Sequence, residues 1–377
     1  MASVAKFSSD KYSEWFGIDL SRYNVFSLFN FRLAMFGIYL RLLMPILVEK
    51  AVERYSPELV FVDIATYRPA GKRIKERVKL IEYIHFPIEV SIEPRFRGSG
   101  LYYGEDPYIL ERYSSPIMRV YWWLYTKLLP RYVRENPFEV ASAVLANSRW
   151  TAEVVKKLYG KTPLVLNPPI APSTQIVYEP VDFNLRSSAV VLLGRFSEEK
   201  RYHWVVERVI PKLIREVKGV EVYIVGSART RASASYLNKI ESLSRKLGLK
   251  VSRDLRPGVS IHLVSDAPRE AINGIMDASK VFLHATINEH WGVAAAEAMA
   301  RGLPVVVHKS GGTWSDLVSK GLFGLGYGCE DEAVDAIAKL LSDEKLWRRY
   351  SKKSLERVRD LAFEKFVEKF LTIEKTI

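Results

Sequence analysis

The sequence predicts an α/β protein with two domains, each built on a parallel sheet flanked by helices. First, 377 residues are more than one ordinary core accommodates, so two domains are expected. Second, the second half of the chain repeatedly shows an apolar strand followed by a helix, the pattern of a parallel sheet. Third, the stretch LNPPIAPSTQIVYEP at 166–180 contains four prolines and no periodicity, which indicates a linker between the halves.

The individual elements follow from local patterns. In the first half we expect strands at 59–63, 80–85 and 143–147, a long helical region up to about residue 140, and a helix at 149–158 capped by Ser148. In the second half, strands around 190–194 and 220–226 are followed by a strand–helix–strand segment at 259–286. The domains predicted from this reading are 1–175 and 176–358, followed by a helix in 359–377 with phenylalanines at helical spacing.

Composition limits the class of protein. The hydrophobic content of 48% and charged content of 26% are those of a folded domain, and the single cysteine, Cys329, fits a reducing compartment. The N-terminal residues show no secretory signal, so we expect a cytoplasmic protein. A net charge of +13 favours anionic partners such as phosphates or an acidic membrane, although a basic solvated surface also explains it. Zinc-finger spacing and RNA-binding aromatic motifs are absent, so we expect no nucleic-acid partner.

The run NEHWGVAAAEAMARGLPVVVHKSGG at 288–312 carries the strongest functional signal. It places Glu289 and Glu297 eight residues apart around Gly292, which opens an alanine-rich helix between two apolar strands. In parallel α/β sheets ligands bind at the carboxyl ends of the strands, where this loop must lie. The free N–H groups and positive dipole of a helix N-terminus suit a phosphate or a sugar hydroxyl there. The run therefore indicates recognition of a nucleotide-activated sugar.

A second block, VVLLGRFSEEKRYHWVVERVIPKL at 190–213, adds cations to this prediction. An apolar strand ends at Gly194-Arg195, and Lys200 follows just before a helix. Two cations on one loop suit a diphosphate, Arg195 through its planar fork and Lys200 as a point charge.

Together these blocks resemble glycosyltransferase family 4, whose members are retaining enzymes of the GT-B fold. The two glutamates with their flanking strands, Gly302-Leu303-Pro304 and Gly311-Gly312 resemble the donor-site signature of that family. The segments LIEYIHFPIEV at 80–90 and VLANSRWTAEVVKKLYGKTPLVLNPPI at 144–170 resemble its alpha-1,2-mannosyltransferases that extend lipid-linked oligosaccharides. The resemblance implies two Rossmann-like domains facing a cleft, with the C-terminal helix packing back on the first domain.

The resemblance also implies roles for individual residues. Glu297 would accept hydrogen bonds from the ribose, and Glu289 would lie against the donor sugar beside backbone N–H groups. Arg195 and Lys200 would hold the diphosphate and stabilise charge on the leaving group, and His85 would lie beside the donor sugar. Further expected donor-binding residues are Gly194, Gly226, Val264, His290, Trp291, Gly292 and Val293. Structural alternatives stay open: an exposed helix glutamate, a helix cap, a solvated pair of cations and a packed histidine.

The reaction implied is transfer of a hexose with retention, most simply mannose from GDP-mannose to a glycan or a lipid-diphosphate acceptor. No Asp-x-Asp triplet and no histidine–carboxylate cluster with metal spacing occurs, so we expect neither a metal nor another cofactor. A UDP-sugar donor is an alternative. The family's opening strand and glycine-rich loop are missing from residues 1–24, where Gly17 is the one glycine, which raises a non-catalytic partner subunit as a second alternative. A sugar-nucleotide epimerase is a third.

Two segments bear on membranes. Residues 25–48 have the length of a bilayer span, but Arg32 and Arg41 lie on opposite sides of a helix and would each cost about 2.5–3.5 kcal/mol at its centre, so we predict a buried core helix. Residues 116–134 place cations opposite aromatic and leucine side chains, the pattern of a helix in the headgroup layer. We expect that face, with Trp122 and Tyr125, to contact an anionic membrane peripherally on its cytoplasmic side, with an aromatic core helix as the alternative.

Overall fold

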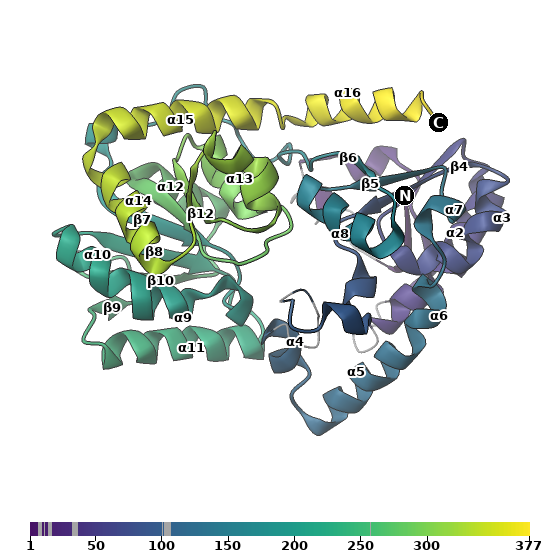
Figure 1. Ribbon diagram of the computed structural model, residues 1–377, viewed down its shortest axis with the longest axis horizontal. Helices are drawn as coiled ribbons and strands as arrows, with labels where there is room; N and C mark the ends of the chain where they lie inside the picture. The colour runs from purple at the N-terminus through teal and green to yellow at the C-terminus, as the bar shows by residue number, and fades with distance from the viewer. Residues whose placement is uncertain are drawn as a thin grey trace. The chain divides into compact units, whose positions relative to one another are not determined.

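The computed structural model describes the chain except residues 7–9, 11, 14–16, 32–36, 100, 102–106 and 257. It divides the chain into two compact units, one of Met1–Ser173 with Phe363–Ile377 and one of Thr174–Ala362. The sheets are parallel throughout their described pairings. Figure 1 shows the helices that surround them.

The first unit contains a four-stranded sheet and a separate pair of strands. The four-stranded sheet has the order β3-β4-β5-β6, and the pair is β1-β2. The strands are β1 Ala2–Ala5, β2 Phe26–Phe29, β3 Leu59–Val62, β4 Lys79–Ile84, β5 Ala143–Ala146 and β6 Leu164–Val165. The α-helices are α2 Met44–Tyr55, α3 Gly71–Lys75, α4 Pro107–Arg112, α5 Pro116–Leu128, α6 Pro130–Val133, α7 Pro137–Val140, α8 Arg149–Tyr159 and α16 Phe363–Glu374. Short 3-10 turns are η1 Leu20–Arg22, η2 Tyr39–Leu43, η3 Ala65–Ala70, η4 Ile88–Ser91 and η5 Pro94–Phe96.

Most predicted elements of this unit are confirmed. The strands at 59–63, 80–85 and 143–147 correspond to β3, β4 and β5, and the helix at 149–158 to α8. Its cap is as expected, because the Ser148 hydroxyl accepts a hydrogen bond from the Thr151 N–H at 3.1 Å. The C-terminal helix α16 lies on the four-stranded sheet, where Phe366 and Phe370 pack with Ile81 and Tyr83.

The opening strand and glycine-rich loop that we expected to be missing from residues 1–24 are checked only in part. The strand β1 lies there and pairs in parallel with β2, but it does not join the four-stranded sheet, and residues 7–9, 11 and 14–16 lie outside the described residues. A second expectation is wrong. The segment 25–48 is not one buried helix: it contains β2, then the turn η2, and α2 begins only at Met44. Arg32 lies outside the described residues, and Arg41 is exposed on η2. The segment resembles one long helix because it is apolar throughout. Its phenylalanines at the start favour a strand, however, and the proline in the first turn of α2 favours a helix that begins there.

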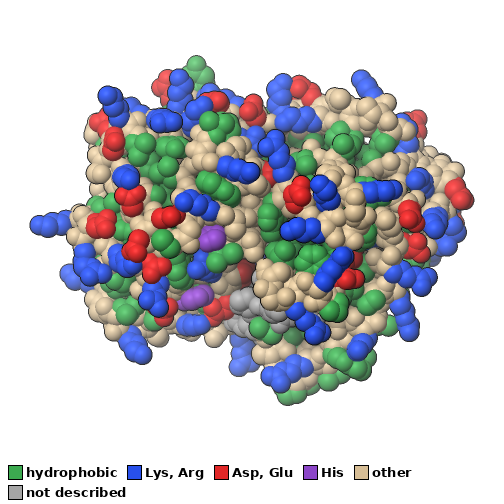
Figure 2. Space-filling view, in the orientation of Figure 1, with side chains coloured by type: hydrophobic (Ala, Val, Ile, Leu, Met, Phe, Trp, Pro, Cys, Tyr) green, Lys and Arg blue, Asp and Glu red, His purple; other side chains and the backbone are tan. Residues whose placement is uncertain are grey.

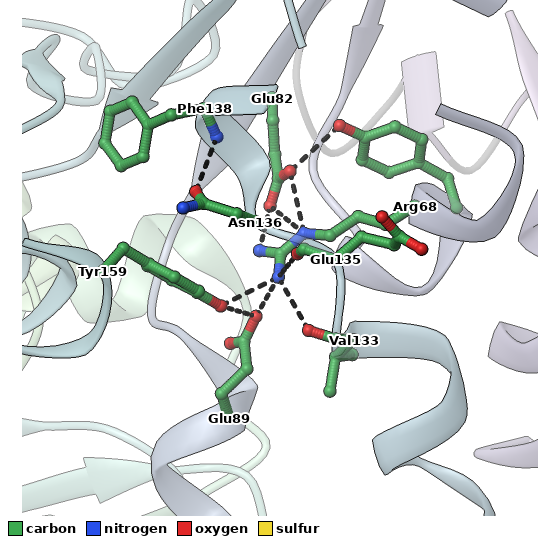
Figure 3. Close-up of polar contacts among 9 residues, drawn as sticks. Arg68, Glu82, Glu89, Val133, Glu135, Asn136, Phe138 and Tyr159 are labelled. Atoms are coloured by element: carbon green, nitrogen blue, oxygen red, sulfur yellow. Dashed lines mark hydrogen bonds and ion pairs between the residues drawn. The ribbon is translucent and has the colours of Figure 1, made fainter. Parts of the chain in front are cut away.

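A buried charged cluster fixes the loop after β4 (Figure 3). The fully buried guanidinium of Arg68 donates to Glu82 on β4, with Nη2 and Oε1 2.6 Å apart, and also to Glu89 on η4. The Tyr67 hydroxyl donates to the second Glu82 oxygen at 2.9 Å, and the Arg68 guanidinium also donates to the Tyr159 hydroxyl at 2.9 Å. Because a buried charge is stable only when its partners surround it, this cluster holds both ends of the segment that contains His85.

The second unit has a seven-stranded parallel sheet of order β13-β12-β11-β7-β8-β10-β9. The strands are β7 Ser187–Leu193, β8 Glu221–Gly226, β9 Val251–Ser252, β10 Ile261–Ser265, β11 Ser279–His284, β12 Val305–His308 and β13 Leu325–Tyr327. The α-helices are α9 Tyr202–Trp204, α10 Ile210–Glu216, α11 Arg231–Lys246, α12 Arg269–Ala278, α13 Val293–Ala300, α14 Glu330–Ser342 and α15 Glu344–Arg359. The 3-10 turns are η7 Phe183–Leu185, η8 Glu198–Lys200 and η11 Ser319–Gly321, and the π-helical turns are η9 Val205–Val209 and η10 Thr313–Leu317.

The strand–helix succession predicted for the second half is confirmed, and its apolar runs form a continuous core. Valine, leucine and isoleucine side chains of β7, β8 and β10 pack with α10, α11 and α14 on one face of the sheet. Figure 1 shows α12, α13 and α15 on the other side. Strands covered on both faces read as continuous apolar runs rather than as alternating patterns, which is why they were visible in the sequence.

Candidate active site

The strand order of the seven-stranded sheet reverses between β7 and β11. From β7 the chain proceeds outward through β8 to β10, whereas from β11 it proceeds through β12 to β13 on the other side. In open parallel sheets this reversal, at the carboxyl ends of the strands, is where ligands bind. Gly194, Arg195 and Lys200 follow β7, and Glu289 follows β11. These four predicted site residues thus come from the two loops that leave this point.

The loop that carries Glu289 is held by the segment after β12. The Gly312 N–H donates to the Glu289 carbonyl at 2.7 Å, and the Asn288 N–H donates to the Ser310 hydroxyl at 2.8 Å. Gly311 has a φ of +74°, and a Cβ added there would lie 2.3 Å from the Glu289 carbonyl oxygen. Gly311 is therefore required by the close approach of the two backbones.

The same loop ends at Gly292, which starts α13 with a φ of +95°. The Trp291 side chain is buried, and its carbonyl accepts a hydrogen bond from the Thr313 hydroxyl at 3.0 Å. The Trp291 ring therefore shapes the loop, and any donor contact of this residue would come from its backbone. Val293, in the first turn of α13, is exposed.

Glu289 is the centre of a charged cluster that also contains Lys200 and His284. The Lys200 ammonium donates to Glu289 Oε2 at 2.9 Å, and His284 Nε2 lies 3.3 Å from the same oxygen. Lys200 and Glu289 keep only 20% and 21% of their side-chain surfaces exposed. Burial alone would raise the pKa of the Glu289 carboxyl, but His284 and Lys200 together lower that pKa well below its ordinary range. Glu289 is therefore a carboxylate at neutral pH.

Arg195 lies on the same loop as Lys200 and is more exposed. Its guanidinium pairs with Glu199 at 3.3 Å, and the Ser197 hydroxyl donates to the same Glu199 oxygen at 2.6 Å. Gly194 and Gly226 end neighbouring strands so closely that a Cβ on Gly226 would lie 1.7 Å from the Gly194 carbonyl oxygen. Gly226 therefore leaves no room for a side chain, whereas a Cβ on Gly194 would meet the Tyr202 hydroxyl at 3.0 Å and the Lys200 side chain at 3.3 Å.

Glu297 is not a freely solvated helix glutamate. It lies on α13 with its side chain mostly covered, and the Arg269 guanidinium at the start of α12 pairs with its Oε2 at 2.9 Å. Val264 is half-buried near the carboxyl end of β10. His290 is also half-buried, in the loop before Gly292.

The structure adds residues that the sequence did not single out. His284 is the last residue of β11, and its position directly before the glutamate-bearing loop was an available signal. Arg201 has a positive φ of 55°, donates to the Ala285 carbonyl at 3.1 Å and stacks on Trp204 at 4.4 Å. Burial, and then the charge of Arg201, lowers the pKa of His308 at the end of β12.

In the first unit, His85 follows β4 and lies beside Asp63, which follows the neighbouring strand β3. His85 Nε2 and Asp63 Oδ2 are 3.6 Å apart, and the Tyr83 ring lies edge-on to the imidazole at 4.9 Å. The adjacent His85 imidazole lowers the pKa of the Asp63 carboxyl. The sequence reading did not single out Asp63 as a neighbour of His85.

Among the described residues, no group of three or more histidine, cysteine, aspartate or glutamate side chains is arranged to hold a metal ion. Catalysis without a metal stays a prediction, because its test is activity in excess chelator. Within the same described part, no helix is long and apolar enough to cross a membrane.

Comparison with known families identifies the second unit. Residues 179–357 match the family model described as glycosyl transferases group 1. They form a group 1 glycosyl transferase domain. Its matched range contains β7 to β13 and every predicted site residue except His85. The family resemblance drawn from the two glutamates and the glycines is therefore confirmed.

Several curated proteins that are similar to this chain carry one common name. The GDP-Man:Man(3)GlcNAc(2)-PP-Dol alpha-1,2-mannosyltransferase of Eremothecium gossypii is 24% identical over 64% of this chain and 39% of its own length. The mouse protein of the same name is 27% identical over 59% of this chain and 46% of its own length. The aligned part of the chain thus spans less than half the length of these relatives.

Solved structures confirm the fold. Anabaena HepE, crystallised with UDP and glucose, has a TM-score of 0.61 and 17% identity, and the match covers 98% of this chain and 89% of that chain. The architecture is that of GT-B glycosyltransferases, as the sequence resemblance implied.

Proposed function

We propose that the chain is a retaining glycosyltransferase that moves mannose from GDP-mannose to a glycan or a lipid-linked oligosaccharide. The observation that carries this proposal is the cluster of Lys200, Glu289 and His284 at the point where the strand order reverses. The common name of the curated relatives supports mannose and the lipid-linked acceptor.

The donor diphosphate would lie between the loops after β7 and β11. Arg195 and Lys200 supply two positive charges, and each is now paired with a carboxylate, Glu199 and Glu289. A bound donor diphosphate would pair with these cations in addition to the two carboxylates. As the bond to the sugar breaks, negative charge increases on the leaving diphosphate oxygen. Fixed cations near that charge stabilise the transition state more than the ground state, which is what raises the rate.

The two glutamates would hold the ends of the donor. Glu289, kept ionised by its neighbours, would accept hydrogen bonds from sugar hydroxyls, and Glu297 would accept them from the ribose. The ribose would then displace Arg269 from Glu297, or share the carboxylate with it. The N–H groups at the start of α13 would add donors beside Glu289.

Retention follows from transfer on one face of the sugar. The bond between the anomeric carbon and the phosphate oxygen breaks, a bond to the acceptor oxygen forms, and the acceptor proton passes to the leaving phosphate oxygen. No separate carboxylate base is required. His85, whose imidazole Nε2 lies 3.6 Å from Asp63 Oδ2, is kept as a candidate for contact with a sugar hydroxyl.

A UDP-sugar is the second candidate donor, because the structurally similar HepE was crystallised with UDP and glucose. The two candidates are separated by thermal unfolding of the whole chain with GDP, UDP, GDP-mannose and UDP-glucose, because a ligand raises the stability of the state that binds it. We expect the GDP compounds to raise the unfolding temperature, and GDP-mannose to give product with a lipid-diphosphate glycan. No shift with any nucleotide would contradict the proposal.

Contact with an anionic membrane would bring the enzyme to a lipid-linked acceptor, but not through the helix face first expected. The face with Trp122, Tyr125 and Leu129 packs into the first unit against Leu42 and Ile88. That face forms part of a core because apolar side chains of η2 and η4 cover it. We therefore assign the contact to the outward face of α5, which carries the cations. Figure 2 shows lysine and arginine side chains spread over the whole visible surface, so the global charge would add only general attraction.

A further inference from the structure

An apolar groove of about 650 Å³ opens on the first unit between β2, η2 and α5. This volume lies within the range of about 300–1,000 Å³ that is usual for small-ligand sites. Its lining consists of aromatic and aliphatic side chains, among them Leu40, Leu43, Ile117, Val120 and Leu124. The described lining favours hydrocarbon, because a sugar or a nucleotide would leave most of its polar groups without partners against these side chains.

The aromatic wall of the groove is fixed by its own hydrogen bond. The Tyr39 hydroxyl donates to the Tyr121 carbonyl at 2.7 Å, and the two rings meet edge to face at 4.8 Å. The one polar atom of the Tyr39 side chain is therefore already satisfied, and the ring is free to contact an apolar ligand.

The rim of the groove is an exposed apolar face of α5. Ile117 keeps 81% of its surface exposed, and Val120 and Leu124 are exposed as well. Figure 2 shows hydrophobic and basic side chains next to each other at the lower edge of the view, where Figure 1 places α5. Three neighbouring cations, Arg119, Lys127 and Arg131, are exposed and form no ion pair with any described residue. The same surface thus offers hydrocarbon contact and unpaired positive charge.

We propose that this groove binds one hydrocarbon chain of an anionic membrane phospholipid, whose phosphate meets the cations of α5 and α6. The inference rests on the membrane contact in the proposed function and names its partner. Charge complementarity selects the anionic lipid, because unpaired cations beside an apolar groove match a phosphate joined to a hydrocarbon chain. A neutral apolar peptide would leave those cations unused.

The test compares adjacent exposed residues of one helix. Leu124 lines the groove and Trp123 does not, although their exposed fractions are 44% and 56%. We would measure binding of dodecyl phosphate, and of phosphatidylcholine vesicles with and without phosphatidylglycerol, to the whole chain and to the variants Leu124→Gln and Trp123→Gln. Thermal shift with GDP in each variant reports on the second unit separately.

We expect Leu124→Gln to weaken dodecyl phosphate binding by at least about tenfold and Trp123→Gln by less than about twofold, since a polar amide in the groove lacks a partner. Vesicle binding should require phosphatidylglycerol and fall with added salt. Equal effects of the two substitutions on dodecyl phosphate binding would reject the groove as the binding site. Farnesyl phosphate binding more than tenfold tighter than dodecyl phosphate would overturn the phospholipid as occupant and assign the groove to an isoprenoid chain. GDP binding that persists while lipid binding fails would reject this inference alone, and the reverse would reject the proposed donor site alone.

Discussion

Replacing Glu289 by Gln tests the charged cluster most directly, because it removes one charge and keeps the shape. Glu289 Oε2 accepts from Lys200 at 2.9 Å and lies 3.3 Å from His284 Nε2. Unit charges about 3 Å apart attract by roughly 5–6 kcal/mol at an effective dielectric of 20, and desolvation offsets most of this. A net value of about 1.5–3 kcal/mol is typical of a hydrogen bond to a charged group. We therefore expect Glu289→Gln to lower the unfolding free energy of the second unit by about 2 kcal/mol near neutral pH.

The pH dependence of this difference has a defined sign. The pKa of Glu289 in the folded state is lowered below the ordinary 4.5, so its stabilisation is fully present above that pH and is lost as the pH falls through the folded-state pKa. The advantage of the wild type over Glu289→Gln should therefore shrink in acid. Urea unfolding followed by tryptophan fluorescence gives the free energies, and hydrogen exchange of peptides from 279–300 identifies the transition of the second unit.

The matched control is Glu356→Gln. Glu356 pairs with Lys353 at 3.0 Å on the surface of α15, with half of its side chain exposed. Exposed pairs contribute about 0–1 kcal/mol, so this control should change stability little. A pH-independent difference for Glu289→Gln, or one no larger than that of the control, would refute the account of the cluster.

Three further predictions follow from the same contacts. Glu297→Gln should weaken GDP binding in titration calorimetry by about tenfold to a hundredfold, since a charged acceptor for the ribose is lost; unchanged affinity would remove Glu297 from the site. Asp63→Asn and His85→Ala should each lower the transfer rate by about tenfold or more. If Asp63 acts through His85, the double variant should lose no more activity than His85→Ala alone. Additive losses would reject that coupling. Arg68→Met should lower the unfolding free energy of the first unit by about 3–5 kcal/mol in urea titrations, because two buried carboxylates lose their counter-charge, and a loss below 1 kcal/mol would show that the cluster is not essential.

Much of the second unit could be predicted from the sequence because its signals are local. Apolar strands covered on both faces read as continuous runs, and glycines mark places where backbones meet. Gly311 is such a case, since the Glu289 backbone leaves no room for a Cβ, and Gly292 is similarly crowded by the Thr313 side chain. Lys200 and Glu289 were singled out by their positions in loops after apolar strands and given roles by the family resemblance, but their 2.9 Å contact was visible only in the structure.

The first unit was harder to predict because its signals are ambiguous. The helix at 116–134 carries apolar residues on two sides, Trp122 and Tyr125 on one and Val120 and Leu124 on the other. Periodicity identifies an apolar face but cannot tell which face a neighbour covers. The segment 25–48 failed for a related reason, since an apolar run without clear breaks does not separate a short strand from a helix.

By itself the sequence determined the parallel α/β class, the order of the strands along the chain and the family of the second unit, because these depend on residue patterns a few positions long. Only the tertiary structure decided which distant groups meet. It brought Lys200 and His284 to Glu289, Asp63 to His85, and Arg68 to its two carboxylates. Such contacts arise from how strands are ordered in a sheet and how helices cover it, and the spacing of residues along the chain does not encode that order.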